Sequence, residues 1–228
     1  LRDSQVQEVV IRQPSAVEAW PHIWNELSGE QLSSWIQWQV IRALSGYLSD
    51  DLVEAHFDFF GRTLSGTPEL RPRWKRAVAF TESILGEAVG QVYVERHFPP
   101  ESKAQMDELV GNLLEAYRQS IMSLEWMSET TKEKALEKLA TFRPKVGYPD
   151  RWKDYSSLLV SSDDLVGNLE AAAAFEFSRE VGKLGKPVDK DEWFMTPQTV
   201  NAYYTRGFNE IVFPAAILQY PFFDPERE

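Results

Sequence analysis

Apolar residues recur at every third or fourth position along most of the chain, which is the spacing of amphipathic α-helices. A representative segment begins at Ser28-x-x-Gln31, a capping-box pattern in which two side chains satisfy free N–H groups at a helix start. The apolar stripe that follows consists of Leu32, Trp35, Ile36, Val40, Ile41 and Leu44. Similar patterns predict further helices that begin near Ser15, Leu52, Pro68, Pro100, Thr130 and Ser162. The chain up to residue 186 is therefore predicted to be mainly α.

The pattern changes after residue 186, where prolines interrupt runs of β-branched and aromatic residues. Two short strand-like runs, at 200–204 and 209–213, flank a turn at Gly207. We interpret residues 1–186 as a helical domain, and residues 187–228 as a linker and edge strands that begin a second, incomplete domain. We find no other strand for this pair to join, and an isolated hairpin is marginal in water. The segment after about Trp193 is therefore expected to be poorly packed.

Charge and composition exclude several classes of protein. The 228 residues include 35 acidic and 24 basic side chains, so the formal net charge is −11. A surface of that sign repels phosphate, which argues against nucleic acid as a partner. The chain has no cysteine, so thiol catalysis, thiolate metal sites and disulfides are excluded. No apolar run reaches the length of a bilayer span, so no membrane segment is predicted in this chain.

Tryptophans and histidines are the residues most easily mistaken for binding sites. The five tryptophans at helical spacing are predicted to anchor a core rather than to form ligand platforms: Trp20, Trp24, Trp35, Trp38 and Trp74. The three histidines are His22, His56 and His97, and no two are four residues apart. We interpret His97 as a helix-end residue whose charge suits the helix dipole, and the other two as packing or surface groups.

The segment Asn201-Ala202 is the best candidate for a binding function. A strand at a sheet edge can bind an extended peptide through main-chain hydrogen bonds. An asparagine side chain offers that peptide both a donor and an acceptor, and alanine adds no bulk. From the residues alone, an ordinary strand-end or turn asparagine remains slightly favoured at this position.

A series of short motifs, in a fixed order, extends over nearly the whole chain. They are Arg73-Trp74-Lys75, Ala88-Val89-Gly90-x-x-Tyr93-Val94, Leu124-x-Trp126-Met127, Thr131-Lys132-x-x-Ala135, Gly147-Tyr148-Pro149-Asp150-x-Trp152, Pro187-Val188-Asp189 and Trp193-x-Met195-Thr196-Pro197. In these motifs the chain resembles the neprilysin and endothelin-converting-enzyme family of zinc metallopeptidases. Its lack of cysteine is similar to a bacterial member of that family rather than to the disulfide-bonded animal enzymes.

The resemblance implies a fold, an activity and a substrate-binding site. The fold would be the helical cap of a neprilysin-like peptidase followed by the first strands of its catalytic domain. The activity would be zinc-dependent hydrolysis of short peptides on the N-terminal side of apolar residues. The matching positions make Asn201 and Ala202 part of the substrate-binding edge strand. They also place Ile217 and Phe222 in the apolar pocket for the residue after the scissile bond.

The zinc-binding half of such an enzyme has no counterpart in the sequence. The family binds zinc through an H-E-x-x-H helix and a later glutamate, and neither can be assigned among these residues. No catalytic residue and no metal ligand is therefore predicted, and the chain alone is expected to be inactive. Its partners would be peptide substrates and the catalytic C-terminal portion of the same protein, which would bind the zinc.

Two other functions are compatible with the sequence. The chain could be a non-catalytic peptide-binding module that kept the edge strand, or a helical interaction domain. Three cellular locations are likewise compatible with the sequence: the bacterial cytoplasm, the cell surface and secretion.

Overall fold

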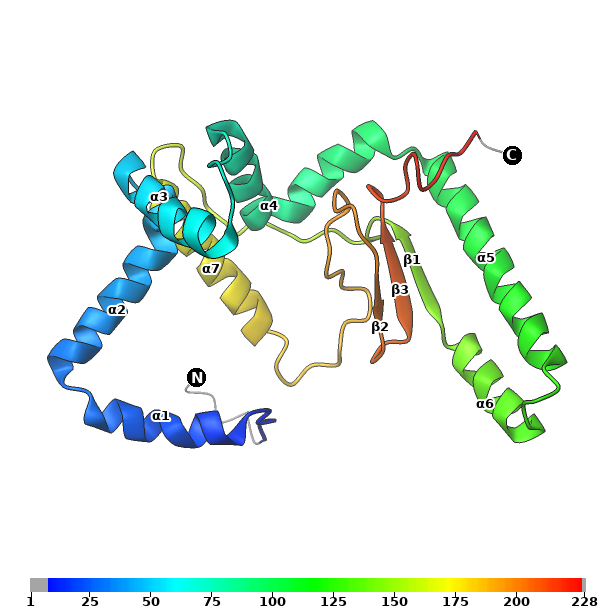
Figure 1. Ribbon diagram of the computed structural model, residues 1–228. Helices are drawn as coiled ribbons and strands as arrows, with labels where there is room; N and C mark the ends of the chain where they lie inside the picture. Colours follow the sequence, from blue (N-terminus) through cyan, green and yellow to red (C-terminus); the bar gives the residue numbers. More distant parts are fainter. Residues whose placement is uncertain (1–7, 227–228) are drawn as a thin grey trace. The chain divides into compact units, whose positions relative to one another are not determined.

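The computed structural model describes residues 8–226, most of which lie in helices, with one small sheet (Figure 1). This confirms the predicted mainly α fold with a few short strands. The chain divides into two compact units. Unit 1 comprises residues 1–77 and 156–188, and unit 2 comprises residues 78–155 and 189–228. The predicted domain boundary after residue 186 concerns the complete protein and stays a prediction.

Unit 1 consists of helices. They are α1 (Pro14–Glu26), α2 (Gly29–Leu44), the 3-10 helix η1 (Ser45–Tyr47), α3 (Asp50–His56), the π-helix η2 (Phe57–Thr63) and α7 (Leu165–Val181). The capping box at Ser28 is confirmed, because its side chain accepts from the Gln31 N–H and the Gln31 side chain accepts from the Ser28 N–H. The similar pattern at Ser15 is not a cap. Helix α1 begins one residue earlier, at Pro14, whose ring nitrogen has no N–H to satisfy.

The prediction that five tryptophans anchor a core is wrong for the described residues. Trp20, Trp24, Trp35 and Trp38 are 44% to 54% exposed, and Trp74 is 65% exposed. Trp20 and Trp35 touch edge to face, with ring centroids 6.5 Å apart, but the apolar faces around them stay open. Helical periodicity tells which face of a helix is apolar. It does not tell whether the element that covers this face belongs to the same segment of chain.

Unit 2 contains most of α4 (Arg73–His97), together with α5 (Pro100–Ser123) and α6 (Glu129–Ala140). Helix α4 is interrupted at Leu85, where the backbone angles leave the helical range. The predicted start of α5 at Pro100 is confirmed. Helix α6 is capped by Ser128, whose hydroxyl accepts from the Thr131 N–H, rather than by Thr130 as its sequence pattern had indicated.

A three-stranded sheet in unit 2 corrects the prediction of a lone hairpin. Its strands are β1 (Arg143–Gly147), β2 (Tyr203–Thr205) and β3 (Glu210–Pro214), and β3 lies between the other two (Figure 1). Strand β1 pairs with β3 in parallel, and β2 pairs with β3 antiparallel. The sequence of β1 gave no strand signal, because Val146 is its only apolar β-branched residue and Pro144 interrupts it.

The sheet also shows that the expected poor packing after Trp193 is wrong. Val212 on β3 and Ala215 just after it are both 0% exposed. Ala215 belongs to a core cluster whose other members are Phe98, Met106, Val110, Val146 and Leu218. Gly147, at the end of β1, has φ of +80°, and a Cβ there would lie 2.5 Å from the Phe98 ring. Only glycine fits this turn against Phe98.

Candidate functional site

The antiparallel strand β2 forms one edge of the sheet, as predicted. Its three residues pair with β3 on one side, and in the described part of the chain no strand pairs with its other side. The turn to β3 is closed by Phe208 and Asn209, whose N–H groups donate to the carbonyls of Thr205 and Arg206. Such an edge presents backbone groups on which an extended peptide could pair.

Asn201 and Ala202 come immediately before this edge strand. The Asn201 side chain is exposed, and its Oδ1 accepts a hydrogen bond of 2.8 Å from the Ala202 N–H. The backbone N–H of Asn201 donates to the Thr199 carbonyl at 3.0 Å. Within residues 8–226, no protein group is hydrogen-bonded to the Asn201 Nδ2. The side chain therefore already has its acceptor in use, while its donor is available to a ligand.

The segment before Asn201 is fixed against helix α4. The Pro197 carbonyl accepts from the Ala216 N–H at 2.8 Å, and the Gln198 side chain donates to the Gly86 carbonyl at 3.0 Å. Gly90 lets the two backbones approach, since a Cβ there would lie 2.8 Å from the Pro197 ring. The segment that leads to Asn201 is thus held by contacts with helix α4 and with Ala216 after strand β3.

The hairpin after Asn201 is tethered to helix α6 through Asn209. This residue has φ of 51°, a left-handed conformation that asparagine tolerates better than most residues. Its Nδ2 donates to the Lys138 carbonyl at 2.7 Å, and its Oδ1 accepts from the Tyr204 hydroxyl at 2.9 Å. One side chain therefore links the turn, the edge strand and the end of α6.

Ile217 and Phe222 lie in the segment after β3, in different surroundings. Ile217 is half-buried and packs against the core cluster, whereas Phe222 is 71% exposed. Between them the Tyr220-Pro221 peptide bond is cis, and the Phe222 N–H donates to the Gln219 carbonyl at 2.9 Å. The chain turns between Gln219 and Phe222, but the shared pocket of the Ile217 and Phe222 side chains stays a prediction.

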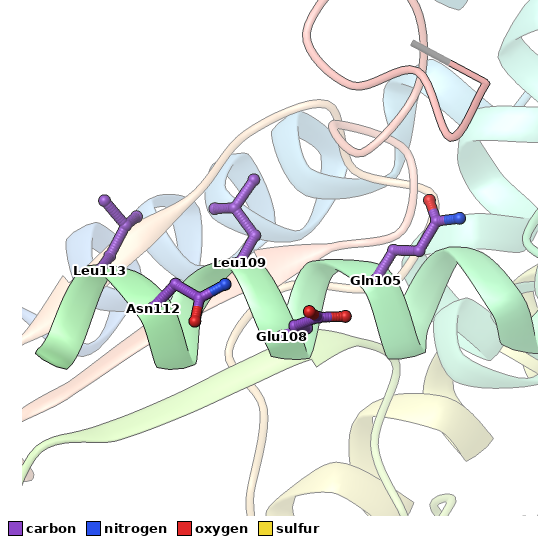
Figure 2. A pocket seen from close by; sticks show the side chains of 5 residues that line it. All are labelled: Gln105, Glu108, Leu109, Asn112 and Leu113. Carbon is purple, nitrogen blue, oxygen red and sulfur yellow. The ribbon is translucent and has the colours of Figure 1, made fainter. Parts of the chain in front are cut away.

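A separate hollow of about 400 Å³ lies on helix α5 (Figure 2). All five of its lining residues come from this one helix: Gln105, Glu108, Leu109, Asn112 and Leu113. It includes none of the residues predicted to bind substrate. Because a single helix supplies this lining, no second element encloses a ligand there, unlike in a typical binding pocket.

Three residues that sequence reasoning missed lie on the sheet next to the candidate edge. They are Lys145, Tyr203 and Glu210. Burial raises the pKa of Tyr203; the carboxylates of Glu210 and Glu192 act in the same direction, and the Phe194 N–H, which donates to its hydroxyl, opposes them. No sequence signal could have found these residues, because their grouping depends on the unexpected strand β1.

Comparison with known proteins identifies the family. The N-terminal model of peptidase family M13 matches residues 1–149, and a second model of the same family matches residues 201–228. The chain belongs to peptidase family M13. The resemblance to neprilysin-like metallopeptidases is thereby confirmed.

Curated M13 relatives come from animals and bacteria. Neprilysin-3 of Drosophila melanogaster is 34% identical over 85% of this chain and 25% of its own length. Human neprilysin is 32% identical over 97% of this chain and 30% of its own length. The neutral endopeptidase of Lactobacillus helveticus is 32% identical over 96% of this chain and 34% of its own length. The chain thus spans about a quarter to a third of these relatives.

Solved M13 structures share the fold. The zinc metalloprotease ZMP1 of Mycobacterium tuberculosis in its open state has a TM-score of 0.88 and 52% identity, over 96% of this chain and 34% of that one. PepO of Lactobacillus rhamnosis has a TM-score of 0.79 and 34% identity, over 91% of this chain and 34% of that one. In both comparisons the present chain spans about a third of the solved protein's length.

The described residues do not fit the zinc site that the family implies. No group of three or more histidine, cysteine, aspartate or glutamate side chains in residues 8–226 could hold a metal ion. The histidines lie on separate elements: His22 is exposed on α1, His56 is in the last turn of α3, and His97 ends α4. We therefore derive no catalytic step through zinc from these residues. Within the same range, no helix is both long and apolar enough to cross a membrane.

Proposed function

We propose that this chain is part of a zinc-dependent metalloendopeptidase that hydrolyses short peptides on the N-terminal side of apolar residues. In this proposal residues 1–186 cap the chamber and limit substrate size, and residues 187–228 begin the catalytic domain. The observation that carries it is the free edge of β2, preceded by the exposed Asn201, in a chain of family M13. The zinc and the general base belong to the remainder of the protein.

A peptide substrate would bind in extended form along this edge. Asn201 Nδ2 would donate to a peptide carbonyl, because it has no protein partner among the described residues. Its Oδ1 would exchange the Ala202 N–H for a peptide N–H, which would free the Ala202 N–H for a main-chain hydrogen bond. One hydrogen bond within the chain would thus be replaced by several to the peptide, and the small Ala202 side chain would leave room for it.

The apolar preference would come from Ile217 and Phe222. Ile217 is held by the core and provides a fixed wall, whereas the exposed Phe222 can close over an apolar side chain. Burying a side chain of leucine or phenylalanine size contributes about 1.5–3 kcal/mol to binding. This accounts for a preference for apolar residues after the scissile bond.

The activity is tested on the complete reading frame to which the chain belongs. We expect peptide hydrolysis that a zinc chelator abolishes and that added zinc restores, while residues 1–228 alone show none. A complete reading frame without an H-E-x-x-H helix would contradict the proposal. Hydrolysis by the 228 residues alone would contradict the assignment of the catalytic groups to the remainder.

The Asn201 side chain is tested by two substitutions in the complete protein. Asn201→Ala removes donor and acceptor, whereas Asn201→Asp keeps the acceptor for the Ala202 N–H, loses the donor and adds a negative charge. Each lost hydrogen bond to the peptide costs about 0.5–1.5 kcal/mol, which is about a two- to tenfold loss of kcat/KM. Unchanged kcat/KM in both variants would show that Asn201 is an ordinary turn asparagine.

A non-catalytic peptide-binding module remains the alternative, and one observation favours it. The sheet has a third strand and its own core within unit 2, so the edge strand does not need the absent part of the protein to be held in place. Peptide binding by the chain alone, measured by calorimetry and weakened by Asn201→Ala, would support this alternative if the complete reading frame lacks zinc-dependent hydrolysis.

A further inference from the structure

One face of the sheet carries polar side chains from all three strands. Lys145 on β1 and Tyr203 on β2 are both paired with Val212 on β3, so the three residues form one row across the sheet. Side chains opposite each other in paired strands project to the same face, as do residues two apart in one strand. Arg143 and Glu210 pair with each other and lie two positions along their strands from Lys145 and Val212, so they are on this face too.

Lys145 and Glu210 form a buried ion pair on this face. The Lys145 Nζ lies 3.0 Å from the Glu210 Oε2, and their side chains are 10% and 0% exposed. No hydrogen bond of good geometry reaches either Glu210 oxygen from the described residues. Among the described residues, the partner of this carboxylate in an ion pair is Lys145. Burying such a pair costs several kcal/mol of desolvation, and apolar residues of similar size are often as stable.

Lys145 also holds a segment that crosses this face of the sheet. Its Nζ donates to the Glu192 carbonyl at 3.0 Å. We name residues 191–194 the strap. Its first residue, Asp191, accepts from Arg143 at 2.7 Å, and the N–H of its last residue, Phe194, donates to the Tyr203 hydroxyl at 2.9 Å. The strap is therefore bound to strands β1 and β2, and it leads directly into the segment that ends at Asn201.

The two side-chain contacts from β1 to the strap differ in their exposure to solvent. The Arg143–Asp191 pair lies at the surface, with side chains 37% and 71% exposed, so solvent screens it. The contact of Lys145 with the Glu192 carbonyl is shielded from solvent and made by a charged donor, which roughly doubles the strength of a hydrogen bond. Of these two contacts, the one made by Lys145 is therefore expected to be the stronger.

We propose that Lys145, held in place by Glu210, is a positioning residue for peptide binding: it fixes the strap and thereby the start of the substrate-binding edge at Asn201 and Ala202. This inference rests on the proposed function of that edge. It explains why a costly buried ion pair occupies the sheet, since an apolar pair could fill the space but could not hold the Glu192 carbonyl. Neither residue touches the peptide.

The test uses three variants of the complete protein. Lys145→Met removes the hydrogen bond to the strap and leaves the Glu210 carboxylate without its partner. Lys145→Met combined with Glu210→Gln also lacks the link to the strap but contains no stranded charge. Asp191→Asn is the matched control, because it weakens the exposed contact of the same strap with the same strand. Each variant is measured for its unfolding midpoint, for kcat and KM per folded molecule, and for amide exchange at Phe194 and Ala202.

We expect Lys145→Met to raise KM by about tenfold with kcat changed less than about threefold, because loss of a buried, charge-assisted hydrogen bond affects binding of substrate and transition state equally. Amide exchange at Phe194 and Ala202 should accelerate. In the double variant the unfolding midpoint should recover relative to Lys145→Met, whereas KM and the exchange rates stay raised. Asp191→Asn should change KM less than about twofold.

A KM that recovers in the double variant together with the unfolding midpoint would overturn the proposal, since the ion pair would then only stabilise the fold. An unchanged KM in Lys145→Met would overturn it as well. Failure of the proposed function looks different, because the wild-type protein would then show no zinc-dependent hydrolysis. In that case unchanged exchange at Ala202 in Lys145→Met would still overturn the positioning role.

Discussion

The two compact units use similar amphipathic helices but differ in what those helices bury. Unit 2 encloses a core in which Phe98, Val110 and Val146 are at most 5% exposed. Unit 1 leaves the apolar faces of α1 and α2 open, including Trp24 and Trp35. In unit 2 a sheet lies against its helices, whereas the described part of unit 1 contains no strand. An apolar helix face therefore stabilises a unit only where the same segment of chain supplies the element that covers it.

The sharpest test of this difference removes one aromatic ring from each unit. Phe98→Ala deletes a ring that is 3% exposed in the core cluster, and large-to-small changes of this kind cost about 3–5 kcal/mol. Trp24→Ala deletes a larger ring that is 51% exposed, for which we expect a loss below about 1 kcal/mol. Amide exchange of β3 and of α1 measures the two local free energies of opening.

The same pair of variants also shows what covers unit 1. If the remainder of the protein packs on α1, Trp24→Ala should cost clearly more in the complete protein than in residues 1–228. Equal losses for Phe98→Ala and Trp24→Ala in the 228-residue chain would contradict the difference between the units.

Glycine substitutions test the close packing of unit 2 at a second point. Gly147→Ala forces a Cβ to within 2.5 Å of the Phe98 ring and gives alanine a φ of +80°. Overpacking and left-handed strain together should lower the free energy of unfolding by about 2–4 kcal/mol. Gly29→Ala at the start of α2 is the matched control in unit 1, because no atom lies within 4 Å of its new Cβ. Urea unfolding of the two variants gives the comparison, and a Gly147→Ala protein as stable as Gly29→Ala would contradict it.

The helices could be predicted from the sequence because their signals are local. Ser28 and Pro100 were read correctly, since a capping box and a proline at the first helical position need only neighbouring residues. Strand β1 was missed, because its pairing with β3 joins positions 67 residues apart, such as Lys145 and Val212. The burial of Lys145 and Glu210 could not be foreseen without that pairing.

In the candidate site, too, the local features could be predicted from the sequence and the long-range contacts could not. The order of strand, turn and strand around Gly207 was readable, and so was the exposed amide of Asn201. Two features of the site could not be predicted from a residue pattern, because they depend on the folded geometry. They are the hydrogen bond from the Ala202 N–H to the Asn201 side chain and the contact of Lys145 with the strap. The exposure of the tryptophans was misjudged for a similar reason, because burial depends on what lies opposite a face.

Capping side chains provide a weaker comparison of the two units. Asn209→Ala removes three side-chain hydrogen bonds, which tie the hairpin to Lys138 in α6, to Thr141 just after it and to Tyr204, and it places alanine at a φ of 51°. We expect a loss of about 1–2 kcal/mol, measured as faster amide exchange in both β2 and β3. Ser28→Ala removes the cap of α2 in unit 1 and should cost about 1 kcal/mol, confined to the first turn of that helix. Loss of protection throughout unit 1 in Ser28→Ala would show a more cooperative unit than its open faces indicate.

The smallest expected effect concerns surface charge, which should contribute little to the difference between the units. On α5 the Glu115 carboxylate accepts two hydrogen bonds from Arg118 and one from Gln119, and these lower the pKa of Glu115 from 4.5 to about 2. Because the folded-state pKa is lowered, the stabilisation is present above about pH 4.5 and is lost as the pH falls through about 2. Arg118→Met should return the pKa of Glu115 towards 4.5, which a side-chain carboxyl titration by NMR would detect. Both residues are exposed, so solvent screening keeps the effect on unfolding small. A large drop in the stability of unit 2 in Arg118→Met would show that its surface ion pairs, and not its buried core alone, distinguish it from unit 1.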